Sequence, residues 1–205
     1  MRSLASKSRR AFLCAALGCC LALPAAAQDK KPASSGNPEH DAMMAEMMKY
    51  AMPATEHQAM AKNLVGSWKT VSKSWMAPGD PMTSEGTSTC TAVLGGRFIQ
   101  ESAKGSMMGM PFEGMGLYGY DLYKKQYVGM WMDTMGTTYM TMTGTADAAG
   151  KTINWSGSWE NPMTKKMETY RMVAKTVDDK TRVFEMWGDM GGKEGKMMEI
   201  TYTRM

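Results

Sequence analysis

Short apolar runs separated by turn residues are the feature that most constrains the fold of this chain. Within residues 95–133, three runs rich in aromatic, aliphatic and Met residues alternate with Gly, Pro and Asp. This pattern is typical of strand, turn and strand, and glycines inside the runs suit sharp bends or close backbone approach. The same rhythm extends to the C-terminus. It predicts strands at 66–76, 84–94, 96–106, 114–122, 126–133, 137–146, 151–160, 166–177, 181–189 and 196–204.

The connections between these runs favour an antiparallel arrangement. No gap is long enough for a crossover helix, so parallel pairing is not expected. Turn sequences such as Ala-Pro-Gly-Asp at 77–80 and Asp-Ala-Ala-Gly at 147–150 favour tight links. Closing such a sheet removes both of its edges. We therefore expect an all-β fold, a closed antiparallel meander barrel of about ten strands, within a single domain at 39–205.

The first 27 residues have the features of an export signal peptide. A basic start is followed by an apolar run at 11–23 that is too short to span a bilayer, and small residues end at Ala27. Ser-Arg-Arg at 8–10 fits the twin-arginine route, and the general secretion route remains an alternative. We expect cleavage near Ala27 and a periplasmic or secreted protein.

Removal of this segment changes the charge and the cysteine content. Four of the 24 basic residues and none of the 20 acidic residues lie in 1–27, so the remaining 178 residues carry 20 of each. A neutral chain does not favour binding to nucleic acid or to an anionic membrane, and no later run is long enough to span a membrane. Of four cysteines only Cys90 remains, which excludes an internal disulfide and a cysteine metal cluster. Oligomeric state has no signal in the sequence.

Two short helices are expected before the strands. Residues 28–38 are polar and resemble a disordered tether. The Asn-Pro pair at 37–38 predicts a helix start, and this helix would run to about Tyr50. The Thr-x-x-Gln pattern at 55–58 fits a capping box, which predicts a second helix at about 56–63.

The first and last expected strands carry a pair of residues that resembles a known barrel signature. Gly-Ser-Trp at 66–68 is similar to the Gly-x-Trp signature of lipocalin-like (calycin) barrels, in which an Arg from the end of the sheet often stacks on the Trp. Arg204 is placed to do this by cation–π contact. With ten strands the first and last run antiparallel, so Trp68 and Arg204 would meet at one barrel end. The residues with expected structural roles are Gly66, Trp68, Gly95, Gly96 and Arg204.

Seven short motifs follow one another along the chain: Pro-Ala-Thr-Glu-His (53–57), Gly-Ser-Trp (66–68), Gly-Gly-Arg-Phe (95–98), Gly-Met-Pro-Phe-Glu-Gly (109–114), Gly-Tyr-Asp (119–121), Trp-Met-Asp (131–133) and Ile-Thr-Tyr-Thr-Arg (200–204). Their order and spacing resemble those of a bacterial family, the domain of unknown function numbered 1579, over roughly residues 40–205. The resemblance implies a calycin-like barrel, usually exported or free-standing, with no settled activity. Ala54 departs from the family, which commonly has Gly there.

The two histidines, His40 and His57, both precede the strands. The barrel strands therefore lack the His needed for a Ser-His-Asp triad, a multi-His zinc site or His-ligated haem. We expect His57 to make a hydrogen bond at a helix N-terminus near the barrel rim.

Methionine is unusually frequent, with 26 in the chain. Strand periodicity puts Met130 with Met132, and Met140 with Met142, on shared faces. Such side chains fill a core or line a cavity that accepts varied apolar ligands. The alternative is copper, because thioethers select Cu(I); no other cofactor is expected. The copper candidates, which share one face of the first helix, are His40, Met43, Met44 and Met47.

The polar residues of the strands favour either an internal ion-pair network or a polar anchor for a ligand. On 126–133 the two faces conflict, since Met130 and Met132 lie on one and Trp131 and Asp133 on the other. The pattern leaves open which face points inward. The candidate ligand-binding residues are Arg97, Tyr118, Tyr120, Met130, Trp131, Asp133, Met140, Met142, Arg171 and Glu199.

These observations favour an exported barrel that binds a small, largely apolar molecule. A periplasmic, methionine-rich Cu(I)-binding protein is the first alternative. The second is a hydrolase-like enzyme, in which carboxylates such as Asp133 and Glu199 would act as acid and base. No substrate or catalytic residue follows from the sequence, so an enzyme is less favoured.

Overall fold

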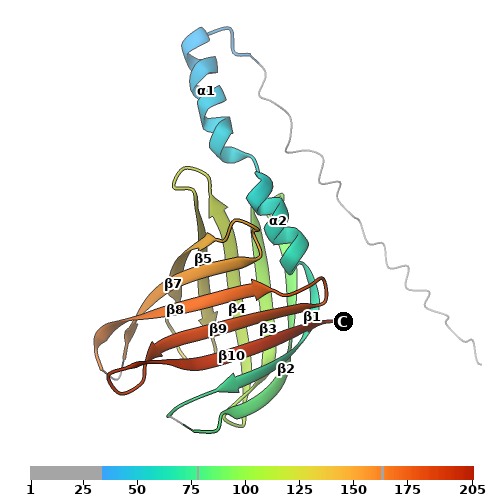
Figure 1. Cartoon of the computed structure of the whole chain (residues 1–205). Helices are drawn as coiled ribbons and strands as arrows, with labels where there is room; N and C mark the ends of the chain where they lie inside the picture. Colours follow the sequence, from blue (N-terminus) through green and yellow to red (C-terminus); the bar gives the residue numbers. More distant parts are fainter. Residues whose placement is uncertain (1–33, 78, 163) are drawn as a thin grey trace, which may run out of the picture. The chain divides into compact units, whose positions relative to one another are not determined.

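The computed structural model describes residues 34–77, 79–162 and 164–205. The predicted signal peptide and residues 28–33 of the tether lie outside the described residues. Two helices precede ten strands (Figure 1). The helices are α1 (Pro38–Ala51) and α2 (Thr55–Leu64). The strands are β1 (Gly66–Ser74), β2 (Met82–Val93), β3 (Phe98–Met107), β4 (Met110–Asp121), β5 (Gln126–Asp133), β6 (Met140–Ala146), β7 (Thr152–Asn161), β8 (Lys166–Thr176), β9 (Thr181–Asp189) and β10 (Glu194–Arg204).

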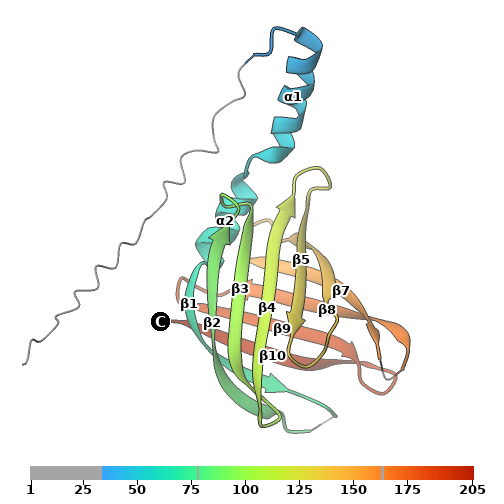
Figure 2. The ribbon, with the colours of Figure 1, turned by 180° about the vertical axis from the view of Figure 1, so that it is seen from behind.

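The strands form one closed barrel. Each pairs antiparallel with its neighbours in the sequence, and β1 pairs with β10 to close the sheet. Figures 1 and 2 show the wall from opposite sides. The predicted all-β meander barrel of ten strands is therefore confirmed.

The largest difference from the expected strand limits lies at the β3–β4 connection. Met107 pairs with Met110, and the two residues between them have positive φ, 51° at Met108 and 77° at Gly109. Positive φ at both central residues is the geometry of a two-residue hairpin turn that matches strand twist. The strands therefore continue to the turn, whereas the sequence pattern predicted a loop down to residue 113.

Glycines inside the strands make room for large side chains on the inner wall. Gly144 is the register partner of Trp155, and a Cβ at Gly144 would lie 2.9 Å from the Trp155 ring. At Gly188 a Cβ would lie 2.9 Å from the Tyr170 ring. Small and large residues thus alternate across the interior, as the taper of a small barrel requires. Within 95–133, where such glycines were expected, a Cβ at Gly114 would lie 2.4 Å from the Trp131 ring.

Helix α2 packs at the barrel end where β1 begins. Met60 is buried in the same core cluster as Trp68 and Ile99, and Trp68 Nε1 donates to the Leu64 carbonyl at 2.9 Å. This contact ties the end of the helix to the first strand.

The start of α2 differs from the predicted capping box. Thr55 is the first helical residue and Ala54 is the N-cap. The Ala54 N–H donates to His57 Nδ1 at 3.0 Å, and the imidazole meets Tyr120 edge-on, with ring centroids 6.0 Å apart. Because alanine has no side-chain acceptor, only one half of a capping box forms, with His57 in the role predicted for Gln58.

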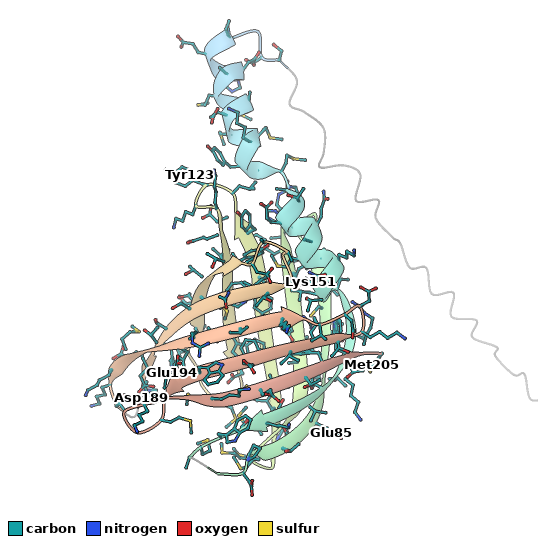
Figure 3. All side chains as sticks on the ribbon, in the orientation of Figure 1. Glu85, Tyr123, Lys151, Asp189, Glu194 and Met205 are labelled. Atoms are coloured by element: carbon teal, nitrogen blue, oxygen red, sulfur yellow. The ribbon has the colours of Figure 1, made fainter. Side chains whose placement is uncertain are left out.

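Helix α1 is capped as predicted but packs little. Asn37 Oδ1 accepts from the Glu39 N–H at 3.0 Å. No residue of α1, all of which is described, is buried. Its C-terminal end meets the barrel through Tyr50 and Tyr123, with ring centroids 5.8 Å apart, and Figure 3 shows Tyr123 on a turn near this end.

The predicted stack of Arg204 on Trp68 is present. The two residues are register partners, and Arg204 Cζ lies 4.2 Å from the Trp68 ring centroid. Arg204 Nη1 also donates to the Val65 carbonyl at 2.9 Å. Gly66 has φ of 136°, and a Cβ there would lie 2.5 Å from Arg204 Nη1. The glycine of the Gly-x-Trp signature is therefore required by both backbone conformation and space.

Candidate ligand-binding site

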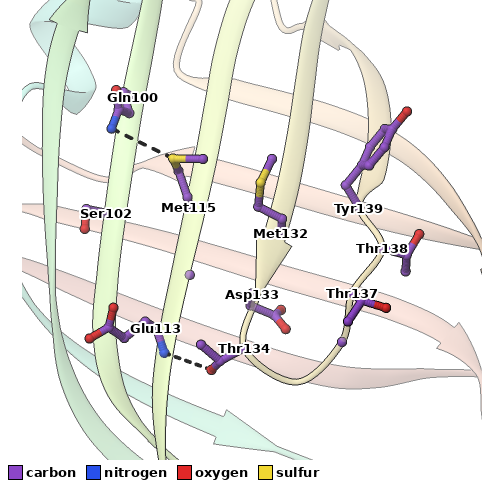
Figure 4. Close-up of a pocket in the computed structure, with 12 residues that line it drawn as sticks. Gln100, Ser102, Glu113, Met115, Met132, Asp133, Thr134, Thr137, Thr138 and Tyr139 are labelled. Carbon is purple, nitrogen blue, oxygen red and sulfur yellow. Dashed lines mark hydrogen bonds between the residues drawn. The ribbon is translucent and has the colours of Figure 1, made fainter.

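Two hollows lie on the outer wall of the barrel. The first, of about 520 Å³, is bordered by Gln100, Met115 and Met132 (Figure 4). Met115 is 41% exposed and its sulfur lies 3.9 Å from Gln100 Nε2. The second, of about 540 Å³, is bordered by Arg171 and Trp187. Both are surface depressions, outside the barrel interior.

Several predicted ligand-binding residues are not inside the barrel. Arg171 donates from Nε and Nη2 to the two carboxylate oxygens of Glu194, at 2.9 and 3.0 Å, on the outer wall. Glu199 accepts from Lys196 at 2.7 Å, and this hydrogen bond lowers the pKa of Glu199. Met130, on β5, also faces outward, like Arg171 and Glu199. The prediction that Arg171 and Glu199 join an internal ion-pair network is wrong, because strand alternation directs Met172 inward instead.

Arg97 also lies away from the interior. It belongs to the turn between β2 and β3, and its Nε donates to the Ala51 carbonyl at 2.7 Å. Its Nη1 donates to the Leu94 carbonyl at 3.1 Å. Arg97 therefore joins the end of α1 to a barrel turn, and its predicted role as a ligand anchor is not supported.

The remaining predicted residues face the interior or its edge. The open question on β5 is resolved, since Trp131 belongs to the side chains packed on the core and its ring lies over Gly114. The other inward residues of the predicted set are Tyr118, Tyr120, Met140 and Met142.

The two carboxylates suggested for an enzyme do not form a pair. Asp133, at the end of β5, accepts from Trp131 Nε1 at 2.8 Å and from the Met135 N–H at 2.9 Å. Glu199 is on the outer wall with Lys196 and with Lys73, whose Nζ lies 3.7 Å from it. Each carboxylate is bound by its own partners on a different part of the wall, so the geometry does not support acid–base catalysis by this pair.

A polar group that sequence reasoning missed lies inside the barrel at Glu101. The residue is 5% exposed. Its two oxygens accept from Ser88 Oγ at 2.6 Å and from the Tyr118 hydroxyl at 3.1 Å. The available signal was strand alternation, because Glu101 is two residues from the inward Ile99.

A second missed group is Arg182, which is 9% exposed. Its Cζ lies 4.2 Å from the Trp68 ring centroid and 4.5 Å from that of Tyr202. Its Nε and Nη2 are buried and have no hydrogen-bond partner in the described part of the chain. Alternation with Phe184 and Met186 on β9 was the signal that would have placed Arg182 inside.

The groups around Glu101 and Arg182 lie deep in the protein. Burial, with a further contribution from Glu101, raises the pKa of the Cys90 thiol from 9.0 to about 11. Burial is also the main cause that raises the pKa of the Tyr118 and Tyr202 hydroxyls well above 10.0. The Cys90 thiol and the two tyrosine hydroxyls are therefore neutral at ordinary pH.

Inward-facing side chains nevertheless retain solvent-accessible surface. Trp68, Ile99 and Met172 are sealed, at 0–1% exposure, whereas Tyr118 and Tyr202 are only half-buried. The same is true of Phe184, Met186 and Ile200, which also face inward. Inward-facing residues therefore differ in burial, and several of them keep accessible surface.

The predicted copper residues occupy a separate place on α1. Met43 and Met47 are 55% and 57% exposed, and His40 Nδ1 lies 3.7 Å from Asp41. Across the described ranges, no group of three or more His, Cys, Asp or Glu side chains is placed to hold a metal ion. Within the same ranges, no helix is long and apolar enough to cross a bilayer.

Solved structures that match this chain have low sequence identity to it. Rv2717c from M. tuberculosis is 16% identical, with a TM-score of 0.57 over 75% of this chain and 99% of that chain. The S-type phycobiliprotein lyase CPES from Guillardia theta is 11% identical, with a TM-score of 0.49 over 77% of this chain and 96% of that one. A redesigned β-barrel is 13% identical, with a TM-score of 0.39 over 72% of this chain and 96% of that one.

The similarity to Rv2717c supports the barrel fold alone. The search of curated proteins found no match. The sequence profile of one family matches residues 52–204, which include all ten strands. The chain therefore belongs to the family described as protein of unknown function DUF1579.

Proposed function

We propose that the protein binds a small, largely apolar molecule inside the barrel. The observation that carries this proposal is the accessible surface left on deep, inward-facing residues such as Tyr118 and Tyr202. A barrel of this kind that served only as a packed scaffold would bury these rings completely. Aromatic and Met side chains line the space, and such side chains suit an apolar ligand.

The interior also has polar groups that can orient a bound ligand. Arg182 lies at the end of the barrel where Trp68 packs against α2, and Glu101 is held by Ser88 and Tyr118. Ligand sites in proteins combine a mostly apolar lining with a few polar groups that fix orientation. This arrangement matches that description on the inner wall.

Native mass spectrometry tests the proposal directly. Protein isolated from its producing cells under native conditions should carry a non-covalent adduct of small mass, which is lost on denaturation. A blocking variant, Gly144→Leu, adds a side chain where a Cβ already meets Trp155. Its folded form should carry less of the adduct than the wild type. An adduct-free protein whose interior also excludes every added apolar probe would contradict the proposal.

Export of the protein remains a proposal that rests on the sequence of residues 1–27. N-terminal sequencing of protein from the periplasmic fraction should give Gln28 as the first residue. Replacement of Arg9 and Arg10 by Lys blocks export if the twin-arginine route is used, and has no such effect on the general secretion route. Full-length protein that stays in the cytoplasm would overturn the assignment.

A second candidate function is Cu(I) binding by α1. The observation that favours it is that α1 leaves Met43 and Met47 more than half accessible, so these two residues do not serve the core. Thioethers are soft ligands that select Cu(I). Leu replaces Met with little change in helix propensity, which makes the triple variant Met43→Leu, Met44→Leu, Met47→Leu a suitable test.

Competition against a Cu(I) chelator should show tight Cu(I) binding by the wild type. The affinity of the α1 variant should be at least tenfold lower. The matched control replaces three exposed methionines of the barrel turns and strands by Leu, at Met108, Met110 and Met167, and should leave the affinity unchanged. Equal affinity in all three proteins would exclude a copper site on α1.

A further inference from the structure

The guanidinium of Arg182 has an unusual environment for a buried cation. The side chain is 9% exposed and lies against the faces of Trp68 and Tyr202. In the described part of the chain, its Nε and Nη2 make no hydrogen bond. Buried polar groups are normally paired, and one that is left unpaired costs free energy. An empty pair of donors on a buried cation therefore points to a missing acceptor.

The outer wall shows what acceptor fits these two donors. Arg171 binds Glu194 through Nε and Nη2, at 2.9 and 3.0 Å, one to each carboxylate oxygen. In Arg182 the same two nitrogens make no hydrogen bond within the described residues. The planar fork of an arginine matches the two oxygens of a carboxylate. These two nitrogens thus have the geometry for a carboxylate.

The internal carboxylate does not supply this acceptor. Glu101 accepts from Ser88 and Tyr118, and within the described ranges it makes no ion pair with Arg182. Its hydrogen bonds hold it in its own network. The Cys90 thiol also interacts with Arg182, but sulfur is only a weak acceptor. The described residues therefore supply no strong acceptor for Nε and Nη2 of Arg182.

An apolar track leads away from Arg182 along the inner wall. Phe184 and Met186 follow it on the same face of β9, and Ile200 is the register partner of Phe184 on β10. All three are half-buried rather than sealed. Four residues of strand span about 13 Å, which suits an acyl chain of medium length.

We propose that Arg182 binds the carboxylate of an apolar monocarboxylic acid through Nε and Nη2, with the apolar chain along Phe184, Met186 and Ile200. This inference rests on the interior ligand site proposed above and names the chemical class that the site takes. The ligand's two oxygens fill the vacant donors, and its chain covers the accessible apolar surface.

Isothermal titration of the full chain, stripped of bound lipid, with decanoate and decan-1-ol tests the proposal. The two probes share a chain and differ in the head group. Decanoate should bind at least tenfold more tightly than decanol, since one charge-assisted hydrogen bond has an effect of that size. Arg182→Gln should lower decanoate affinity to about that of decanol, and Arg171→Gln, on the outer wall, should keep the preference for decanoate.

Arg182→Lys keeps the charge but loses the paired donors, and it should lower decanoate affinity even if Arg182→Gln fails to fold. Equal binding of decanoate and decanol by the wild type would overturn the carboxylate assignment while leaving the interior site in place. A wild type that binds neither probe would instead contradict the interior site itself.

Discussion

The inner and outer walls of the barrel use the same residue types in different ways. On the outside, Arg171 lies 4.7 Å from the Trp187 ring centroid and binds Glu194. On the inside, Arg182 lies against Trp68, and the same two donor atoms are unpaired in the described part of the chain. The outer ion pair is exposed to solvent, whereas Nε and Nη2 of Arg182 are shielded from bulk solvent. The interior therefore carries a cost that the outer wall avoids, and such exceptions are expected where a protein binds something.

Removal of the inner tryptophan should have the largest effect. Trp68 is fully buried between Arg182 and Arg204, so Trp68→Ala should lower the free energy of unfolding by about 3–5 kcal/mol. Trp187→Ala, at the half-buried outer partner, should cost about 1 kcal/mol. Urea unfolding of both variants gives the comparison. Equal losses would show that the inner stack does not organise the barrel end.

Alkaline pH should destabilise the inner wall through Cys90. Its pKa in the folded protein is about 11 rather than 9.0, so the folded state keeps the thiol proton at pH values where the unfolded chain loses it. The resulting stability is complete below pH 9 and is lost as pH rises to about 11, by about 2–3 kcal/mol.

Urea unfolding at several pH values should therefore show a smaller decrease for Cys90→Ala than for the wild type. Tyr118 and Tyr202, whose pKa values are also raised, leave a remaining decrease in the same direction above pH 10. Identical slopes for the two proteins between pH 9 and 11 would contradict the buried, neutral thiol.

Removing charged side chains should change the free energy of unfolding in opposite directions on the two walls. The double variant Arg182→Met, Glu101→Gln takes both charges out of the interior, and we expect it to be more stable than the ligand-free wild type by about 1–2 kcal/mol. The outer control, Arg171→Met with Glu194→Gln, removes an exposed ion pair and should lose less than about 1 kcal/mol. Thermal and urea unfolding measure both. A less stable inner variant would mean that Arg182 and Glu101 serve stability.

The smallest effect is expected at the cap of α2. His57→Ala removes the acceptor for the Ala54 N–H and should cost about 1 kcal/mol, whereas His40→Ala on the unpacked α1 should change stability by less than about 0.5 kcal/mol. Burial lowers the pKa of His57 below 6.5. This stability is present above pH 6.5 and is lost as pH falls below it, which a urea series at pH 5–7 would detect. Equal costs at both histidines would contradict the cap.

The sequence predicted the wall of the barrel well but not its interior. Alternation and turn residues gave the strand order, and the Gly-x-Trp pattern correctly predicted the contact between Trp68 and Arg204. Inward and outward faces were harder to assign on β5 and β8, because Met130 faces outward while Met172 is in the core. Because methionine occurs on both faces, the pattern of apolar residues does not distinguish inward from outward positions.

The polar interior was missed for a related reason. Arg171 and Glu199 were predicted to be paired inside the barrel. Each has a partner, but those partners are on the outer wall. Glu101 and Arg182 occupy positions that alternate with Ile99 and Phe184, and this position, rather than residue type, identifies them. A charged residue at an inward strand position was the signal to follow.

Methionine methyl NMR provides the most direct test of an interior ligand site, because the chain has methionines on both sides of the wall. Met142 and Met172 are 7% and 0% exposed inside the barrel, whereas Met115 and Met167 are 41% and 67% exposed. On titration of methyl-labelled protein with decanoate, we predict saturable shifts for Met186, which lines the proposed track, and for its register partner Met172, and none for Met115 and Met167. Shifts confined to the exposed methionines would contradict an interior site.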